Sequence, residues 1–330
     1  MSEPGLRATS MQFFDQAAVA HALPYPALVD ALAAGLQQAI VSPPRMVCTP
    51  NGDDSAVLIM PAWKAHERMG VKLVSIWPGN SARGQSAVSA VYVLLSCEDG
   101  QPIAVLDGTE LTLRRTAAAA ALAARILARK NSQTLAILGT GSLSAPLATA
   151  HASVMDFKTI LVWGRDAHKA QVVVDRLAAQ GLSAEVSLDL QSTLARADVV
   201  AAASTATEPF IRSDWVKPGT HLGLIGAFTP AMAEAEPALM PSAQLFADSL
   251  EAVLQKGGEV LQAIVQGLIS ASAIQAELAE LAAQPQKAWR QSEDSITVFK
   301  SVGFASLDLI AAEKVFATRP TGARMSSERR

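Results

Sequence analysis

A glycine-containing turn follows a short apolar run in the segment TLAILGTGSLS, which extends from Thr134 to Ser144. A strand at 135–138 that leads through this turn into a helix would aim free backbone N–H groups at an anion such as a dinucleotide pyrophosphate. Gly139 would permit the tight turn, Gly141 would let the phosphates approach, and Ser144 replaces the usual third glycine. An ordinary strand–helix turn also fits this pattern. The expected cofactor contacts here are Gly139, Thr140, Gly141, Ser142 and Leu143.

Basic residues follow the next apolar run, residues 159–163. Arg165 stands 24 positions beyond Gly141, about the separation at which a dinucleotide fold meets the adenosine ribose. An acidic residue at that place selects NAD, whereas an arginine accommodates the 2′-phosphate of NADP. His168 adds a second basic group, and Asp166 fits a solvated helix cap, which is compatible with either function. The pattern favours NADPH, with NADH as the less preferred cofactor.

A lysine earlier in the chain is a candidate for contact with an anion. Lys72 shares one face of an expected strand, 71–77, with Val74 and Ile76. If that face is interior, the lysine needs a carboxylate or a substrate anion as its partner, because lysine is seldom buried alone. An edge-strand lysine that prevents pairing with other chains fits the pattern equally well.

Two adjacent arginines, Arg114 and Arg115, lie in an alanine-rich segment that predicts a helix over 112–130. If the helix begins at residue 112, both fall in its first turn, where the helix dipole disfavours each exposed cation by ~0.3–1 kcal/mol. A bound carboxylate would explain them, since a planar guanidinium binds both carboxylate oxygens. The alternative is that both point into solvent. Arg45, which follows two prolines beside an expected strand, is a third candidate or a solvated charge.

The elements that would position these groups change in type along the chain. Apolar runs and turns within residues 45–107 predict an antiparallel meander. After residue 133, strands and helices alternate, which predicts an α/β fold with a doubly wound parallel sheet. Loops after two of its strands, with Ser204, Thr205 and Phe228, should line the cofactor crevice. The expected parallel strands are 135–138, 159–163, 184–187, 199–202, 220–225, 244–246 and 296–300.

Composition narrows the class of protein. The chain has 330 residues, 50% of them hydrophobic and 17% charged, which fits a globular protein of two domains. Its net charge of −3 gives no electrostatic reason to expect nucleic-acid binding. No apolar run approaches the ~18 residues of a membrane span, and the N-terminus lacks a signal-peptide core. Cys48 and Cys97 cannot form a disulfide framework, so a reducing cytoplasm is expected. The histidines form no HxxxH pair, and no bound metal is expected.

Taken together, these motifs resemble the ornithine cyclodeaminase/mu-crystallin family over nearly the whole chain. The matching segments are PPR with Arg45, GVKLVSIWPGN with Lys72, LTLRRTAA with Arg115, LGTGSLS, IGAFTP and FKSVGFASLDL. The resemblance implies a mixed α+β dimerisation and substrate domain, residues 1–117 and 304–330, into which a Rossmann-type NADP(H)-binding domain, 118–303, is inserted. It also implies a homodimer.

The resemblance assigns roles to particular residues. It makes Arg45, Lys72 and Arg115 the cluster that binds the substrate carboxylate, and it places Ser301 and Gly303 near the nicotinamide. Arg114 falls where the family pattern usually has an apolar residue, so Arg115 takes the arginine role. Lys72 is the candidate to polarise or protonate the substrate nitrogen, with a water molecule as the alternative.

One departure from the family pattern separates its activities. The cyclodeaminases carry an aspartate where this chain has Phe228, and a phenylalanine transfers no proton, so ornithine cyclodeamination is expected to be absent or weak. The resemblance then implies NADPH-dependent reduction of Δ1-pyrroline-2-carboxylate, or of six-membered Δ1-piperideine-2-carboxylate, to L-proline or L-pipecolate, within proline metabolism and hydroxyproline degradation. The remaining alternatives are an alanine dehydrogenase-like enzyme and a non-catalytic NADP(H)-dependent ligand-binding protein.

Overall fold

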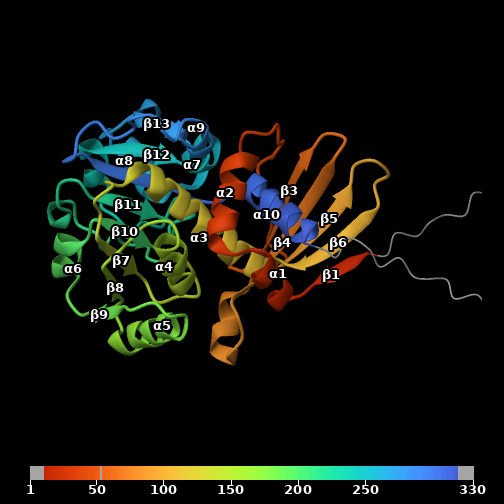
Figure 1. Ribbon diagram of the computed structural model, residues 1–330, viewed down its shortest axis with the longest axis horizontal. Helices are drawn as coiled ribbons and strands as arrows, with labels where there is room; N and C mark the ends of the chain where they lie inside the picture. Colours follow the sequence, from red (N-terminus) through yellow and green to blue (C-terminus); the bar gives the residue numbers. More distant parts are fainter. Residues whose placement is uncertain (1–10, 53, 319–330) are drawn as a thin grey trace, which may run out of the picture.

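The computed structural model describes residues 11–52 and 54–318. Two β-sheets lie side by side, one built from the first six strands and the other from the last eight (Figure 1). Helix α3, Gly108–Leu127, joins the last strand of the first sheet to the first strand of the second. The α/β fold predicted from the sequence is confirmed.

The six-stranded sheet has the order β1-β6-β5-β4-β3-β2. Strands β2 to β6 pair antiparallel in chain order, which confirms the predicted meander. Strand β1 adds a parallel edge beside β6 that the sequence analysis did not predict. The strands are β1 Gln12–Phe14, β2 Met46–Cys48, β3 Ala56–Lys64, β4 Arg68–Ile76, β5 Val88–Ser96 and β6 Pro102–Asp107, and a 3-10 helix, η1 Pro78–Arg83, follows β4.

Helices α1 Gln16–Ala22 and α10 Ala305–Ala317, together with α3, pack on the inner face of this sheet, and α2 Tyr25–Gly35 packs on α3 and α10. Helices α2 and α10 pack closely, since a Cβ added at Gly35 would lie 2.7 Å from Ile310 Cγ1. Within the described residues, no single helix is long and apolar enough to cross a membrane; α1 and α2 together, bent by 74°, meet that test by length and composition only.

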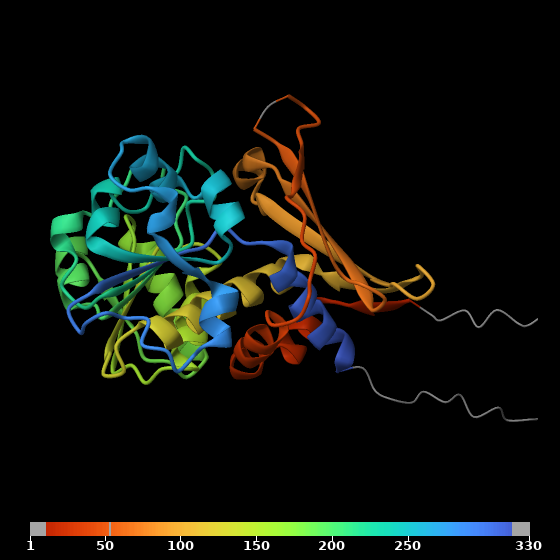
Figure 2. The same ribbon diagram turned by 90° about the horizontal axis from the view of Figure 1, so that it is seen from above.

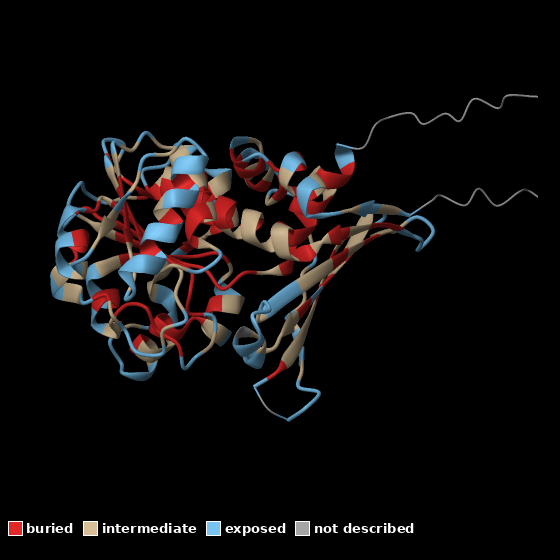
Figure 3. Ribbon diagram, turned by 90° about the horizontal axis from the view of Figure 1, so that it is seen from below, coloured by how far each residue is buried: buried red, intermediate tan, exposed pale blue. Residues whose placement is uncertain are grey.

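The opposite face of the six-stranded sheet has no described helix or strand packed over it (Figure 2 and Figure 3). We call this surface the outer face. It is apolar: Phe13 is 74% exposed, Met46 60% and Leu73 37%. Half-buried Val71 and Val93 face each other across β4 and β5 on the same side.

The eight-stranded sheet is parallel throughout, with the order β13-β12-β14-β11-β10-β7-β8-β9. The chain builds outwards from β7 in one direction through β8 and β9 and then in the other through β10 and β11, so the topological switch point lies between β7 and β10. Strand β13 was not predicted. The strands are β7 Thr134–Leu138, β8 Thr159–Trp163, β9 Glu185–Ser187, β10 Val199–Ala202, β11 His221–Leu224, β12 Ala243–Ala247, β13 Ile274–Glu277 and β14 Ile296–Lys300.

Helices connect these strands and cover both faces of the sheet (Figure 1). The α-helices are α4 Ser144–Ala152, α5 Ala167–Ala179, α6 Leu190–Arg196, α7 Leu250–Lys256, α8 Gly258–Val265 and α9 Leu278–Ala283. The 3-10 helices are η2 Ser213–Trp215, η3 Pro237–Ser242 and η4 Ala271–Ala273.

Helix α3 corrects one expectation from the sequence. It begins at Gly108, one turn before the predicted start, because the Asp107 side chain caps it by accepting a hydrogen bond from the Glu110 N–H at 2.8 Å. Arg114 and Arg115 therefore lie beyond the first turn, and the argument from the helix dipole does not apply to them. The domain boundary predicted between residues 117 and 118 falls inside this helix and stays a prediction.

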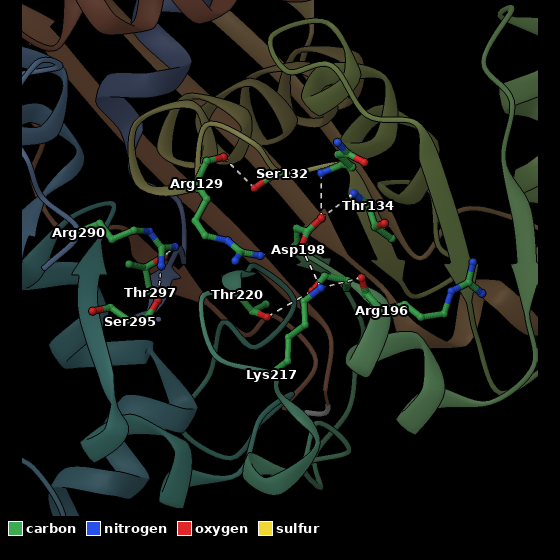
Figure 4. Close-up of polar contacts among 12 residues, drawn as sticks. Arg129, Ser132, Thr134, Arg196, Asp198, Lys217, Thr220, Arg290, Ser295 and Thr297 are labelled. Carbon is green, nitrogen blue, oxygen red and sulfur yellow. Dashed lines mark hydrogen bonds and ion pairs between the residues drawn. The ribbon is translucent and has the colours of Figure 1, made fainter. Parts of the chain in front are cut away.

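Asp198, just before β10, fastens the far end of α3 to the second sheet (Figure 4). Its carboxylate accepts hydrogen bonds from the N–H groups of Gln133 and Thr134 at 2.8 and 3.0 Å, and it forms ion pairs with Arg129 and Lys217, each at 2.8 Å. Although burial raises the pKa of Asp198, the hydrogen bonds and Lys217 outweigh it and hold the pKa below its usual value.

Candidate active site

A cavity of about 340 Å³ lies where the carboxyl ends of parallel strands face the inner side of the six-stranded sheet and helix α3. Ligands of doubly wound sheets bind at this edge, next to the switch point. The structure brings residues from both ends of the chain and from its centre to this one cavity. The predicted site residues that line it are Arg45, Lys72, Arg115, Gly141, Ser142, Leu143, Ser204, Thr205, Phe228, Ser301 and Gly303.

Lys72 and Arg115 share a buried carboxylate that the sequence analysis missed. Asp308, in the first turn of α10, accepts hydrogen bonds on Oδ1 from Lys72 Nζ and from Arg115 Nε, both at 2.8 Å. Lys72 is 1% exposed and lies on β4, between β3 and β5, so the edge-strand interpretation is wrong. The one available signal for Asp308 was an acidic residue in an otherwise apolar helix, FASLDL.

The electrostatics of this trio set the protonation of the lysine. Burial and the adjacent Arg115 guanidinium lower the pKa of Lys72 to about 7, while Asp308 acts in the opposite direction. Burial raises the pKa of Asp308, but Arg115 and Lys72 outweigh it and bring the pKa below its usual value. Lys72 can therefore exchange a proton near neutral pH while Asp308 stays ionised.

Arg45 reaches the same cavity from the segment before β2. Its Nη2 donates hydrogen bonds to the carbonyl oxygens of Val302 and Gly303, at 2.8 and 2.6 Å. Gly303 has φ +74°, and an added Cβ would lie 2.8 Å from Arg115 Nη1, so a side chain there would displace the arginine. The turn after β14 thus holds Arg45 on the cavity and leaves space for Arg115.

Asp248, after β12, fixes that turn from behind. It is buried, and its Oδ2 accepts hydrogen bonds from Ser301 Oγ at 2.7 Å and from the N–H groups of Val302 and Gly303 at 3.0 and 2.7 Å. This carboxylate was also missed, because only the fold brings residue 248 beside residues 301–303. It shapes the cavity without lining it.

The glycine turn after β7 fits a dinucleotide. Gly139 has φ +125°, and an added Cβ would lie 2.7 Å from the Ala203 carbonyl oxygen, so the turn requires glycine. An added Cβ at Gly141 would meet nothing within 4 Å, which leaves the cavity edge open for phosphates above the start of α4. Ser144, in the place of a third glycine, donates a hydrogen bond from Oγ to the Gly139 carbonyl at 2.9 Å.

Four predicted cofactor residues do not line the cavity: Gly139, Thr140, Arg165 and His168. Arg165 is exposed on the turn between β8 and α5, and His168 is exposed in the first turn of α5. This turn lies against the glycine turn, since a Cβ added at Gly164 would be 2.5 Å from Thr140 Cγ2. Asp166 caps α5 by accepting hydrogen bonds from the His168 and Lys169 N–H groups. The predicted cap by Asp166 is confirmed.

Arg114 faces away from the cavity. It forms an ion pair with Glu110, Nε to Oε1, at 2.6 Å, and its Nη1 donates a hydrogen bond to the Leu23 carbonyl at 3.0 Å. Of the two arginines, the structure brings only Arg115 to the cavity.

Comparisons with known proteins agree with this architecture. The family model described as the ornithine cyclodeaminase/mu-crystallin family matches residues 12–320. A Delta(1)-pyrroline-2-carboxylate reductase of Paracoccus denitrificans is 38% identical over 257 residues, which cover 77% of this chain and 80% of the relative.

Two solved structures are similar over 93% of this chain. Thermococcus litoralis Delta(1)-pyrroline-2-carboxylate reductase, in complex with NADH and L-proline, has a TM-score of 0.88, 26% identity and 97% of its own chain covered. An archaeal alanine dehydrogenase dimer with bound NAD has a TM-score of 0.85, 28% identity and 95% of its chain covered. The chain belongs to the ornithine cyclodeaminase/mu-crystallin family.

Proposed function

We propose that this protein is an imine-reducing oxidoreductase that converts Δ1-pyrroline-2-carboxylate to L-proline with NADPH. The observation that carries the proposal is the convergence of Arg45, Lys72 and Arg115 on the cavity that the glycine turn after β7 also lines. Similarity to a reductase of this imine, and to a solved one in complex with NADH and L-proline, supports the same reaction.

In this proposal Arg45 and Arg115 bind the substrate carboxylate. Both guanidinium groups lie on the cavity, and the Val302 and Gly303 carbonyls together with Asp308 fix their orientation. Such fixed donors lose little conformational freedom when the anion arrives. A carboxylate bound this way would place the adjacent C=N bond between Lys72 and the nicotinamide side of the cavity. Such alignment can lower the activation barrier by ~7–11 kcal/mol.

Lys72 then supplies the proton. When bound, the reduced nicotinamide supplies the hydride that the C=N carbon accepts. The imine nitrogen gains its proton from Lys72 Nζ, and the product is the secondary amine of the ring. A donor works best when its pKa is near the working pH, and burial with Arg115 lowers that of Lys72 to about 7.

The rest of the cavity favours a ring without a second charge. No Asp or Glu occurs among the described residues that line it, so the distal ammonium of ornithine would have no carboxylate partner there. Phe228 cannot move a proton, and its side chain would help to exclude water from the reacting carbon. We propose that a six-membered ring is accepted as well as a five-membered one; the apolar part of the wall includes Leu58, Val74, Ile76, Val88, Leu113 and Phe228.

The preference for NADPH rests on Arg165 and His168. Both are exposed beside the glycine turn, where the adenosine ribose of a dinucleotide lies in such folds. If Arg165 contacts the 2′-phosphate, Arg165→Ala should weaken NADPH and leave NADH binding unchanged. An unaltered ratio of the two dissociation constants would rule out this role.

The outer face of the six-stranded sheet supports a homodimer. Apolar side chains that include Phe13, Met46 and Leu73 lie exposed on it, and such a continuous patch is typical of a protein interface. The similar archaeal alanine dehydrogenase is a dimer. We place the enzyme in the cytoplasm, consistent with its free Cys48 and Cys97, and in proline metabolism.

A comparison of three reactions tests the proposal. Purified protein is assayed for NADPH oxidation with Δ1-pyrroline-2-carboxylate, for NADH oxidation with pyruvate and ammonia, and for proline formation from L-ornithine with NAD. The imine should be reduced fastest and ornithine should give no proline. Faster turnover of pyruvate would favour the alanine dehydrogenase-like alternative. No turnover in any of the three assays would favour a ligand-binding protein.

A further inference from the structure

Behind the cavity lies a cluster of charged side chains with no part in the proposed chemistry. Glu234, Glu259 and Lys300 are each at most 1% exposed, and none of them lines the cavity. Burying three ionisable groups is costly unless each is paired or hydrogen-bonded. Their partners therefore show what the cluster holds in place.

Glu234 joins the ends of two neighbouring strands. Its Oε1 accepts a hydrogen bond from the Ser204 N–H at 2.6 Å, and its Oε2 accepts one from the Gly226 N–H at 2.7 Å. Ser204 follows β10 and Gly226 follows β11, and both residues line the cavity. The two loops touch, since a Cβ added at Gly226 would lie 2.1 Å from the Ser204 carbonyl oxygen.

Glu259 extends the connection to a third strand. Its Oε1 accepts a hydrogen bond from the Glu234 N–H at 2.9 Å, and its Oε2 forms an ion pair with Lys300 Nζ at 2.8 Å. Lys300 ends β14 and immediately precedes Ser301, on the cavity. One buried network thus connects the ends of β10, β11 and β14.

These three strands lie next to one another in the half of the doubly wound sheet that begins at β10. The two halves of such a sheet each take one mononucleotide, and the ribose-selecting position lies after the second strand of the first half. Strands β7, β8 and β9 therefore face the adenosine half of the cofactor, and β10, β11 and β14 face the nicotinamide half. The network lies wholly behind the nicotinamide half.

We propose that Glu234 is a positioning residue that holds the loops after β10 and β11 in the shape that binds the nicotinamide half of the cofactor. The role rests on the nicotinamide-dependent function proposed above. It requires both carboxylate oxygens, because each one accepts from a different loop. Glu234 does not line the cavity and acts through the two loops, so its loss should affect one half of the dinucleotide and not the other.

The test uses ligands that differ only in the nicotinamide half. Dissociation constants of the full-length protein and its Glu234→Gln variant are measured for NADPH and for adenosine 2′,5′-bisphosphate, which lacks the whole nicotinamide mononucleotide, or for NADH and 5′-AMP if the protein binds NADH more tightly. Glutamine has the same side-chain shape, but its NH2 group would face one of the two loop N–H groups. Two donors would then oppose each other, and that hydrogen bond would be lost. Weakening of the complete dinucleotide by about tenfold, with unchanged affinity for the fragment, is the expected result.

Two further variants separate positioning from general damage. Glu236→Gln alters a carboxylate two residues away that accepts from the Ser213 N–H and Oγ, at 2.9 and 3.1 Å, on a loop that does not line the cavity; both affinities should stay unchanged. Glu234→Asp keeps the charge but cannot span both loops, and it should reproduce the selective loss even if the glutamine variant fails to fold.

The result that would overturn the proposal is a Glu234 variant, folded by its urea unfolding curve, that weakens both ligands equally or neither. Because binding is measured without the imine, this outcome is distinct from failure of the proposed reaction. An unsubstituted protein that binds NADPH but does not reduce the imine would contradict the reaction and leave the Glu234 test valid.

Discussion

Two cationic side chains share one carboxylate oxygen at the centre of the site. Lys72 Nζ and Arg115 Nε both lie 2.8 Å from Asp308 Oδ1, and all three side chains are buried. A buried charge is tolerated only with a partner, and here the cations outnumber the carboxylate that they contact. A substrate carboxylate would balance this charge, which explains why positive residues from three distant segments converge on one cavity.

Replacement of Arg115 tests its contact with the substrate. Arg115→Ala should lower kcat/KM for the imine by about 10- to 100-fold, because a hydrogen bond to a charged group contributes about 1.5–3 kcal/mol. NADPH affinity, measured by fluorescence, should stay unchanged. The matched control is Arg114→Ala, which removes the neighbouring guanidinium that faces away from the cavity and should leave kcat/KM intact. An equal loss of cofactor affinity in Arg115→Ala would refute the assignment.

The pH profile tests Lys72 as the proton donor. Its pKa is lowered to about 7, and only the protonated amine can donate, so kcat should fall as the pH rises through about 7. The Asp308 charge raises this pKa, so Asp308→Asn should move the midpoint to lower pH. A midpoint that is identical in the two proteins would exclude Lys72 from the proton transfer and favour a water molecule.

At the scale of elements, helix α3 links the substrate side to the cofactor side. Its first half carries Arg115 to the cavity, and beyond its other end Arg129 pairs with Asp198 at the amino end of the parallel sheet. Its alanine-rich middle is buried between α2 and α4, where small side chains allow close packing. The attachment at Asp198 therefore serves stability and lies away from the chemistry.

Asp198→Asn should lower the free energy of unfolding by about 1–3 kcal/mol, because the amide cannot accept all the donors that surround the carboxylate. Urea unfolding measures the loss, and kcat/KM should stay unchanged. The pKa of Asp198 is depressed from 3.8, so its contribution is present above that pH and is lost as the pH falls below it. The difference between the two proteins should therefore shrink in acid, and a constant difference would contradict the ionic origin.

At the scale of the whole molecule, the outer face is the surface that the proposed dimer would cover. Strands β4 and β5 place Lys72 and Tyr92 on the inner face and Val71 and Val93 on the outer one, because successive side chains alternate. The same strands therefore build the active site on one side and an apolar surface on the other. Covering this surface with a second copy would remove it from water.

Val93→Lys should convert the proposed dimer to a monomer, since a charge at the centre of an apolar interface loses its hydration on association. Sedimentation velocity measures the change. Val172→Lys is the matched control. Val172 is 39% exposed on α5, far from the six-stranded sheet (Figure 1), so the same substitution there should leave the dimer intact. A Val93→Lys protein that sediments as the unsubstituted one would place the interface elsewhere.

The sequence predicts local features well and long-range partners poorly. The glycine turn and most parallel strands follow from periodicity and turn residues within a few positions. Alternation also shows that Lys72 shares a strand face with Val74 and Ile76, but it does not decide whether that face is interior. Asp308, Asp248 and Glu234 escape prediction because their partners lie 30 to 236 positions away or, for Gly226, in a neighbouring loop with no pattern of its own. Strands β1 and β13, QFF and IQAE, are short and mix polar with apolar residues, so neither an apolar run nor alternation marks them.

The central claim is that hydride passes from the nicotinamide to the imine carbon. The most direct measurement supplies NADPH labelled with deuterium at C4 of the nicotinamide, in either of its two stereochemical forms, together with Δ1-pyrroline-2-carboxylate, and analyses the product by mass spectrometry and NMR. We predict L-proline with one deuterium at C2 from one of the two labelled forms. Oxidation of NADPH without labelled proline, or no oxidation at all, would contradict the proposed reaction.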